Sequence, residues 1–288
     1  MPQIINTNIA SLNAQRNLNM SQGALQVATQ RLSSGLRVNS AKDDAAGMAI
    51  AERMHAQARG FAVAMRNAND GISLAQVAEG ALARVTDNLQ RMRELAIQAR
   101  NATNSPSDKN ALDKEFGELA KEIQRNIRGT PFNGKPILAD AAGTQVFQVG
   151  ANTTDNDVIE FTTTNLAADA LVTVISGTDA TGSGRATIDG TTDITQIATV
   201  IANIDAAFDK INGDRAILGA QQNRFDAVIS NLQISYENQM AARSRIMDAD
   251  YAQETSALSR ANILQQAGTA MVAQANQLPQ QVLQLLRG

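Results

Sequence analysis

Residues 45–100 read AAGMAIAERMHAQARGFAVAMRNANDGISLAQVAEGALARVTDNLQRMRELAIQAR, and this proline-free stretch decides the fold. Because residues three or four apart stack on one face of a helix, its apolar pattern predicts one long helix with a two-row seam. A seam of this length cannot bury itself, so it requires equally long partner helices, as in a coiled coil. The first row comprises Met54, Phe61, Ala68, Ala75, Leu82, Leu89 and Ala96, and the second comprises Ala58, Met65, Ile72, Ala78, Val85, Met92 and Ala99.

The partner helices are predicted at the two ends of the chain. Leu18, Leu25 and Leu32 keep a seven-residue period near the N-terminus, and helical patterning returns from about residue 193 to residue 286. The simplest arrangement is an out-and-back hairpin. The predicted fold class is therefore mainly α: a long antiparallel helical bundle or coiled coil formed by both chain ends.

Both chain ends are nearly free of charge. The only charged residues before Lys42 are Arg16, Arg31 and Arg37, and those after Glu254 are Arg260 and Arg287. Two readings stay open for residues 1–41: a weakly stable tail that is disordered alone, or a segment that orders only against copies of itself.

Turn and cap signals divide the middle of the chain. Ser40 with Asp43 predicts the start of the long helix, and Ser105-Pro106 with Asp108 predicts the start of the next one, which Gly129 ends. Residues 130–190 predict a small β-rich insertion at the distal side of the bundle. Its expected strands are 145–149, 158–162 and the β-branched run 171–175.

Composition narrows the function. The chain has 288 residues, 43% hydrophobic and 3% aromatic, with a net charge of −3 and no cysteine. We therefore expect no nucleic-acid partner, no membrane partner, no disulfide and no thiolate metal site. The N-terminus has no basic region followed by an apolar block, so we expect no cleaved secretory signal.

The groups that catalysis needs are missing from the sequence. The single histidine, His55, lies beside the seam, and no Cys/His cluster can hold zinc. Asp155-Asn156-Asp157 resembles the start of a calcium loop, but the glycine and the distal glutamate fall at the wrong spacing. We predict a protein that is not an enzyme and that has no metal and no cofactor.

Nine collinear stretches resemble bacterial flagellin. They are I-NTN (4, 6–8), RLSSGLR (31–37), NSAKDDAAG (39–47), RNANDGIS (66–73), QRMRELA (90–96), QNRF (222–225), ARSRI (242–246), DADY (248–251) and ILQQAG (263–268). The resemblance implies a structural subunit that self-assembles into the helical filament of the flagellum, used for swimming. It implies export of the unfolded chain and an extracellular location.

The resemblance also implies a domain plan. An inner terminal helical domain, which lines the tube, would comprise residues 1–43 with 247–288. An outer-core helical domain would comprise 44–164 with 194–246, with β-hairpins near 130–164. Residues 165–193 would be a short variable surface segment, in place of the large outer domains of many flagellins.

Site residues carry over from the resemblance only at matched positions. A surface for subunit packing and for innate receptors would comprise Arg91, Leu95, Gln98 and Glu115. Inner-tube packing would fall to Val282, Leu283, Leu285 and Leu286.

The implied partners are identical subunits, the flagellar export apparatus and an export chaperone. Hook-associated junction and cap proteins, and host flagellin-sensing receptors, are also implied. The alternative reading is a hook–filament junction adaptor of related architecture.

Overall fold

The computed structural model describes residues 7–285, with side chains through residue 277, and the chain forms two compact units. The terminal unit comprises Met1–Gln57 with Glu237–Gly288, and the central unit comprises Ala58–Tyr236. These units do not share bounds with the expected domains, whose limits at residues 43 and 247 stay a prediction.

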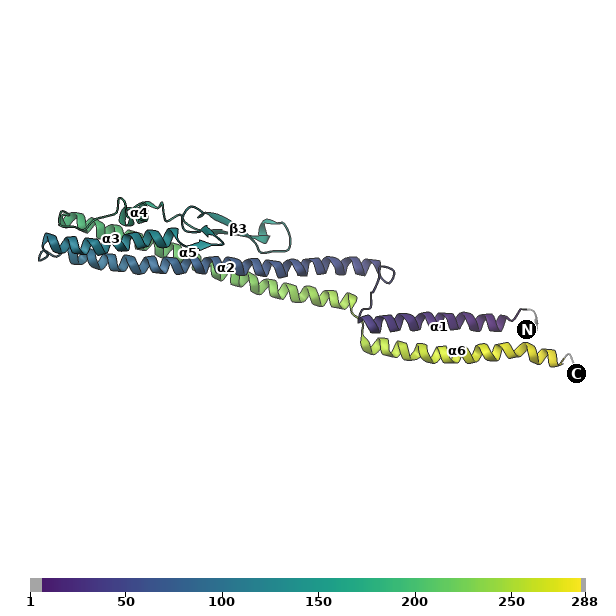
Figure 1. Cartoon of the computed structure of the whole chain (residues 1–288). Helices are drawn as coiled ribbons and strands as arrows, with labels where there is room; N and C mark the ends of the chain where they lie inside the picture. The colour runs from purple at the N-terminus through teal and green to yellow at the C-terminus, as the bar shows by residue number, and fades with distance from the viewer. Residues whose placement is uncertain (1–6, 286–288) are drawn as a thin grey trace. The chain divides into compact units, whose positions relative to one another are not determined.

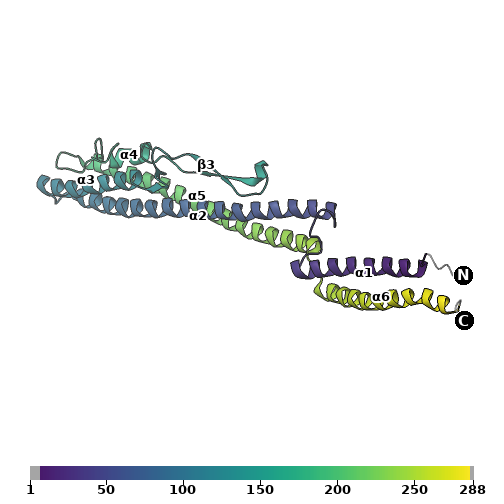
Figure 2. The same ribbon diagram turned by 45° about the vertical axis from the view of Figure 1, so that its right-hand side comes forward.

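The terminal unit is built on α1 (Ile9–Ser34) and α6 (Tyr251–Leu285), which lie side by side and antiparallel (Figures 1 and 2). The side chain of Asn8 caps α1 by accepting a hydrogen bond from the N–H of Ser11. Gly35 ends α1 in the left-handed conformation (φ 71°), which glycine adopts without steric cost.

A short antiparallel contact follows α1 within the terminal unit. Leu36 bridges Asp248, and the N–H of Arg37 donates to the carbonyl of Met247 at 2.6 Å. Val38 and Met247 form a small apolar cluster with Ala51. This contact fixes the chain where α1 has ended and α6 has not yet begun.

The long helix is confirmed as α2 (Ala45–Ala99), but its predicted start was wrong. Asp44 rather than Ser40 makes the cap, because its Oδ1 accepts from the N–H of Gly47 at 2.8 Å. Asp43 instead accepts from the backbone and the hydroxyl of Ser40, closing the turn before the helix.

The central unit contains most of α2, α3 (Pro106–Arg128) and most of α5 (Ile194–Met247). The predicted start of α3 at Ser105 is confirmed, and the structure shows a capping box there, with reciprocal hydrogen bonds between Ser105 and Asp108 and with Pro106 in the first turn. Ion pairs tie α2 to α5 in antiparallel register, from Arg93 to Asp205 at 2.7 Å and from Arg215 to Glu79 at 2.7 Å.

Two small antiparallel sheets lie beside these helices. They consist of β1 (Pro131–Phe132) with β2 (Lys135–Pro136), and β3 (Thr144–Gln148) with β4 (Val158–Thr162). A one-turn helix η1 (Asp155–Asp157) precedes β4. The Asn133-Gly134 turn takes positive φ at both residues, as its sequence predicts.

Three aromatic rings join the β3–β4 hairpin to α5. Phe147 packs edge-on against Phe161 and Phe225, with centroids 6.1 and 5.6 Å apart. α2 supplies Gly71 at this point, where an added Cβ would lie 2.6 Å from Cζ of Phe225. The absence of a side chain at Gly71 therefore makes room for the aromatic cluster.

The predicted strand at 171–175 is wrong, because this run forms the helix α4 (Ala170–Ser176). Asp169 caps α4 by accepting from the N–H of Leu171, and Gly177 ends it. Val172, Ile175 and Ser176 are buried at helical spacing, so tertiary packing has overridden the β preference of the branched residues.

Residues 165–193 are therefore not simply a surface segment. Leu166, Val172, Ile175 and Ile188 all belong to the core of the central unit. Arg185 forms a bidentate ion pair with Asp113 of α3, at 2.9 and 2.6 Å, and its guanidinium lies 6.0 Å from the ring of Phe116. Gly117 leaves the room that the guanidinium needs.

The seam of α2 is buried over its distal part. Leu82 and Leu89 are 1% exposed, whereas Met54, Phe61, Met65 and Ile72 are half-buried. The mainly α fold with a small β insertion is confirmed.

Candidate assembly surfaces

The α1–α6 pair turns small side chains toward its own contact. Ser11, Ser21 and Ala28 are the buried residues of α1, and Ala261 and Ala275 are buried on α6. Gly268 lies against Leu18, where a Cβ would come within 3.1 Å of the leucine Cδ1. Small residues let the two helix backbones approach closely, but they bury little apolar area.

The same two helices turn large apolar side chains outward. At 100° per residue, the exposed large apolar residues of α1 fall within an arc of about 80°, so they form one continuous row along the helix. We call this row the α1 stripe and its counterpart on α6 the α6 stripe. The α1 stripe comprises Ile9 (64% exposed), Leu12 (57%), Met20 (60%) and Val27 (44%), and the α6 stripe comprises Ile263 (67%), Leu264 (53%) and Met271 (57%).

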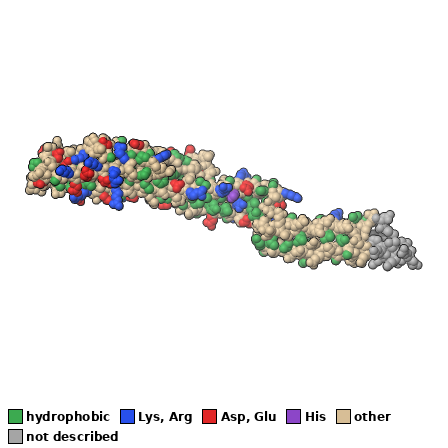
Figure 3. All heavy atoms as spheres, in the orientation of Figure 1, with side chains coloured by type: hydrophobic (Ala, Val, Ile, Leu, Met, Phe, Trp, Pro, Cys, Tyr) green, Lys and Arg blue, Asp and Glu red, His purple; other side chains and the backbone are tan. Residues whose placement is uncertain are grey.

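Polar contacts set the register of α1 against α6. The amide of Asn8 donates to the carbonyl of Ala275 at 2.7 Å, and Arg31 pairs with Glu254 at 3.1 Å. Apart from the Arg31–Glu254 ion pair, the described contact between α1 and α6 contains few charged side chains. On the face drawn in Figure 3, red and blue side chains are dense over the central unit and sparse over α1 and α6.

The seven-residue period predicted near the N-terminus is carried by Leu18, Leu25 and Leu32, which are half-buried on α1. Met20 and Val27 of the α1 stripe were missed. Their offsets of 11 and 18 from Ile9 return to the same helical face, and this period is the signal that could have found them. The predicted inner-tube residues Val282, Leu283, Leu285 and Leu286 lie outside the part of the chain whose side chains are described.

Some of the residues expected to form a packing surface on the central unit lie together at its surface. Arg91 Nε donates to Glu115 at 2.8 Å, and its Nη1 donates to Glu94 at 2.9 Å. The resemblance had not placed Glu94 in this surface. The hydrogen bond to Glu115 is the main cause that raises the pKa of Arg91, followed by that to Glu94. Gln98 is exposed on the same helix.

Leu95 differs from that expectation. It is 1% exposed and lies in the core cluster of the central unit, so its side chain is not available at the surface. Leu95 can act there only by holding α2 in place beneath Arg91 and Gln98.

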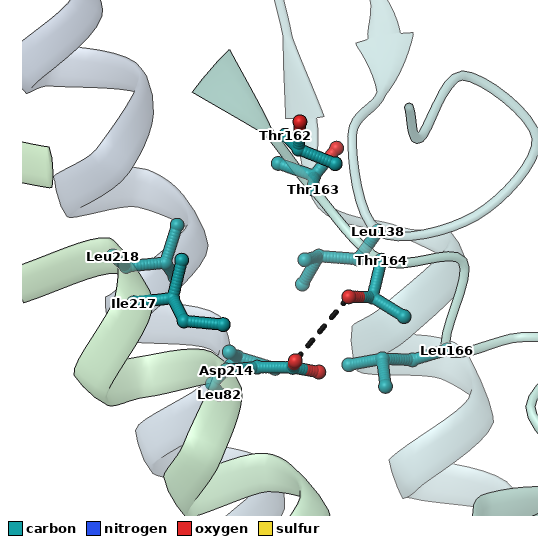
Figure 4. Close-up of a pocket in the computed structure, with 9 residues that line it drawn as sticks. All are labelled: Leu82, Leu138, Thr162, Thr163, Thr164, Leu166, Asp214, Ile217 and Leu218. Carbon is teal, nitrogen blue, oxygen red and sulfur yellow. Dashed lines mark hydrogen bonds between the residues drawn. The ribbon is translucent and has the colours of Figure 1, made fainter. Parts of the chain in front are cut away.

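A small cavity in the central unit illustrates how its polar groups are used (Figure 4). Its volume is about 20 Å³, room for about one water molecule. Asp214 on its wall accepts from Lys210 at 2.8 Å and from the hydroxyl of Thr164 at 3.3 Å. The carboxylate is thus engaged in structural contacts with both neighbours.

Within residues 7–285, no three His, Cys, Asp or Glu side chains gather as a metal site would require. No helix in that part of the chain is both long and apolar enough to cross a membrane.

Together, the antiparallel terminal pair and the helical body define a structural helical protein with large exposed apolar stripes. Family models match both ends of the chain: the bacterial flagellin N-terminal helical region at residues 5–142 and the C-terminal helical region at residues 201–286.

Known flagellins match the chain along its whole length. Flagellin of Halalkalibacterium halodurans is 46% identical over 284 residues, covering 99% of this chain and 100% of that one. Flagellin of Serratia marcescens is 43% identical over 352 residues, covering 100% of both chains. A crystal structure of Bacillus cereus flagellin matches with a TM-score of 0.47 and 29% identity, over 58% of this chain and 88% of that one.

The chain belongs to the bacterial flagellin family. It is a structural subunit that self-assembles into the homopolymeric filament of the flagellum, outside the cell, and serves swimming motility. Nothing in these relationships favours the hook–filament junction adaptor.

Proposed function

We propose that the α1 and α6 stripes are the surfaces through which subunits of the filament join. The observation that carries this proposal is the outward placement of seven large apolar side chains, 44–67% exposed, on two helices whose buried residues are small. Exposed apolar rows of this extent mark surfaces that another molecule covers. In a homopolymer, that molecule is another copy of the chain.

The domain plan and the inner-tube residues extend this proposal. Residues 1–43 with 247–288 would line the tube, and Val282, Leu283, Leu285 and Leu286 would continue the packing toward the C-terminus. Contacts of this kind join unlike surfaces and do not close on themselves, so they generate a helical filament rather than a ring.

Leu12→Asp tests the α1 stripe. Leu12 is 57% exposed, so the aspartate remains solvated in the monomer and should leave its thermal melt nearly unchanged. A joined stripe would bury that carboxylate without a partner, so elongation of filament seeds should fall by at least about tenfold. Seeded growth followed by light scattering and electron microscopy gives the rate.

Val146→Asp is the matched control, because Val146 is 63% exposed on β3 and lies outside both stripes. It should elongate seeds at the rate of the unmodified protein. Elongation by the Leu12→Asp protein at that same rate would reject the α1 stripe as an assembly surface.

We further propose that Arg91, Gln98 and Glu115 form a second contact surface, used between subunits and by host flagellin-sensing receptors. Arg91 and Glu115 are about half exposed and are held together by their ion pair. Receptor-reporter cells should respond less to Arg91→Ala and Gln98→Ala proteins than to Arg84→Ala, a change at an exposed arginine of the same helix. Equal responses to all three would exclude this receptor surface.

The remaining proposed partners follow from family membership. They are the export apparatus, an export chaperone, and the hook-associated junction and cap proteins. We also propose that the chain has no enzymatic activity, which its engaged carboxylates and the filament role support.

A further inference from the structure

Four arginines lie in the nearly uncharged helices α1 and α6 and in the segment that follows α1. α1 contains two charged residues, Arg16 and Arg31, and no acidic residue. α6 contains Glu254 as its one acidic residue, and Arg260 as its one basic residue. Arg37 lies in the segment that follows α1. A charge on an assembly surface is costly to bury unless it has a partner. The position and the partner of each arginine therefore decide what it does during assembly.

Two of the arginines are engaged inside the subunit. Arg31 Nη1 lies 3.1 Å from a carboxylate oxygen of Glu254, whose side chain is 13% exposed. Arg37 donates from Nε and Nη2 to the carbonyl of Ile246, at 3.2 and 2.7 Å. That carbonyl belongs to the last turn of α5, where backbone acceptors lack helical partners. Both side chains therefore serve the internal structure of the terminal unit.

The other two arginines lie on the stripes. Arg16 follows Leu12 by four residues and precedes Met20 by four, so it sits in the middle of the α1 stripe. It is exposed, and among the side chains of residues 7–277 its Nη2 donates to the neutral side chain of Asn13, at 3.1 Å, and to no carboxylate. Arg260 precedes Ile263 and Leu264 by three and four residues, and it is exposed with no ion-pair partner within residues 7–277.

Copies of the chain cannot neutralise these two charges with the described parts of α1 and α6. The single carboxylate there, Glu254, is already paired with Arg31 and is largely buried. Bringing stripes together therefore concentrates positive charge on a surface that is losing water. Like charges repel more strongly as the local dielectric constant falls, and dissolved salt screens the repulsion.

We propose that Arg16 and Arg260 make the assembly surface for a second copy of this chain salt-gated. The two arginines oppose the joining of stripes at low ionic strength, and screening removes that opposition as salt rises. The apolar residues supply the attraction, and the arginines set the subunit concentration at which the attraction prevails. This inference rests on the proposed role of the stripes.

The test is the critical concentration for seeded polymerisation of the full chain, measured from about 0.01 M to 1 M sodium chloride, where the screening length falls from about 30 Å to about 3 Å. At the lowest salt, the Arg16→Gln/Arg260→Gln protein should polymerise at a critical concentration at least about fivefold below that of the unmodified protein. At the highest salt the two values should agree within about twofold, since screening then replaces the mutation.

Two control proteins separate charge from other effects. Arg16→Lys/Arg260→Lys keeps both charges and should retain the salt dependence. Lys135→Gln removes one charge from the exposed first residue of β2 and should leave the critical concentration unchanged at every salt concentration. Circular dichroism melts check that each monomer folds as the unmodified protein does.

The opposite result has a clear meaning. If the double glutamine protein polymerises no better at low salt, or polymerises worse, the arginines contribute nothing or act as contacts, and the salt gate is excluded. Failure of the stripes themselves is distinguished by Leu12→Asp: normal growth of that protein rejects the surface, whereas blocked growth with unchanged arginine variants rejects only the gate.

Discussion

The two units of the molecule bury opposite kinds of side chain. In the central unit, Leu82, Leu89 and Phe225 are no more than 1% exposed, and its charged residues form ion pairs between helices. In the terminal unit, serine, alanine and glycine meet across α1 and α6, and Leu12 and Ile263 face outward. The central unit is therefore stabilised by its own core, whereas the terminal unit leaves its large apolar stripes exposed to solvent.

This difference shows how one chain can be both a stable subunit and a polymer component. Burying apolar surface stabilises by about 25 cal/mol for each Å² removed from water. The apolar area that α1 and α6 leave exposed therefore does not stabilise the monomer. It stabilises the filament when a further copy of the chain covers it. We expect substitutions in the central unit to change the stability of the monomer, and substitutions on the stripes to change assembly.

Leu89→Asp should have the largest effect on the monomer. Leu89 is 1% exposed in the seam of α2, so the carboxylate would be buried without a partner and should cost about 4 kcal/mol. Gln90→Asp, at the exposed neighbouring position, should cost less than about 0.5 kcal/mol. Urea midpoints followed by circular dichroism compare the two, and equal midpoints would show that the seam is not a core.

The seam of α2 and the terminal helices could be predicted because apolar residues that recur at helical spacing lie on one face of a helix. The cap of α3 could be predicted as well, since Ser105, Pro106 and Asp108 act through bonds within one turn. α4 could not, because its branched residues favour strand, and only their packing in the central core makes the helix. The half-burial of Met54 and Phe61 was also beyond reach, since periodicity does not tell how many partner elements cover each turn.

Asp113→Ala should have the next largest effect, at about 3 kcal/mol. Asp113 accepts from both terminal nitrogens of Arg185 and from the N–H of Ile188, at 2.6–2.9 Å. Its loss would leave a guanidinium that is 19% exposed without a counter-charge. Hydrogen exchange should then rise over residues 165–193 while α1 and α6 stay unchanged.

Asp87→Ala provides the matched comparison, because Asp87 pairs with Arg84 on the surface, with both side chains more than 60% exposed. That loss should cost only a few tenths of a kcal/mol. If the Asp87→Ala protein lost as much protection as the Asp113→Ala protein, residues 165–193 would not depend on the Arg185 ion pair.

Two glycine substitutions sharpen the comparison between the units. Gly71→Ala places a Cβ 2.6 Å from the ring of Phe225 and should destabilise the central unit by about 2 kcal/mol. Gly23→Ala meets nothing within 4 Å and lies inside α1, so it should stabilise that helix by up to about 1 kcal/mol. Hydrogen exchange resolves the two regions, and shifts of the same sign would contradict the difference in packing.

The site was less predictable than the fold for a related reason. Arg91 and Glu115 were found by resemblance, and their ion pair follows from the packing of α3 on α2. Leu95 carries the same resemblance, yet it is 1% exposed and lies in the core cluster of the central unit. A matched motif identifies positions, but only the helix packing determines which of them reach the surface.

Acid should produce the smallest effect, and it should act unequally on the two units. In the central unit, Asp108, Asp157, Asp179, Asp189 and Asp193 have pKa values below the usual range, mainly because neighbouring serine, threonine and backbone groups donate hydrogen bonds to their carboxylates. In the terminal unit only Asp43 has a pKa lowered in this way within the described residues, through the backbone N–H groups of Asn39 and Ser40.

A carboxyl whose pKa is lower in the folded state stabilises the fold above its unfolded pKa, about 3.9, and loses that contribution as pH falls through the folded value. Hydrogen exchange over residues 152–193 should therefore rise between about pH 4 and pH 2, while exchange in α1, which has no acidic residue, changes least. Asp179→Asn should flatten the response around residues 179–183, where the carboxylate accepts from the N–H groups of Thr181 and Ser183. If acid instead exposed α1 first, charge on the loops would not be what distinguishes the two units, and their different packing would have to account for the order of unfolding alone.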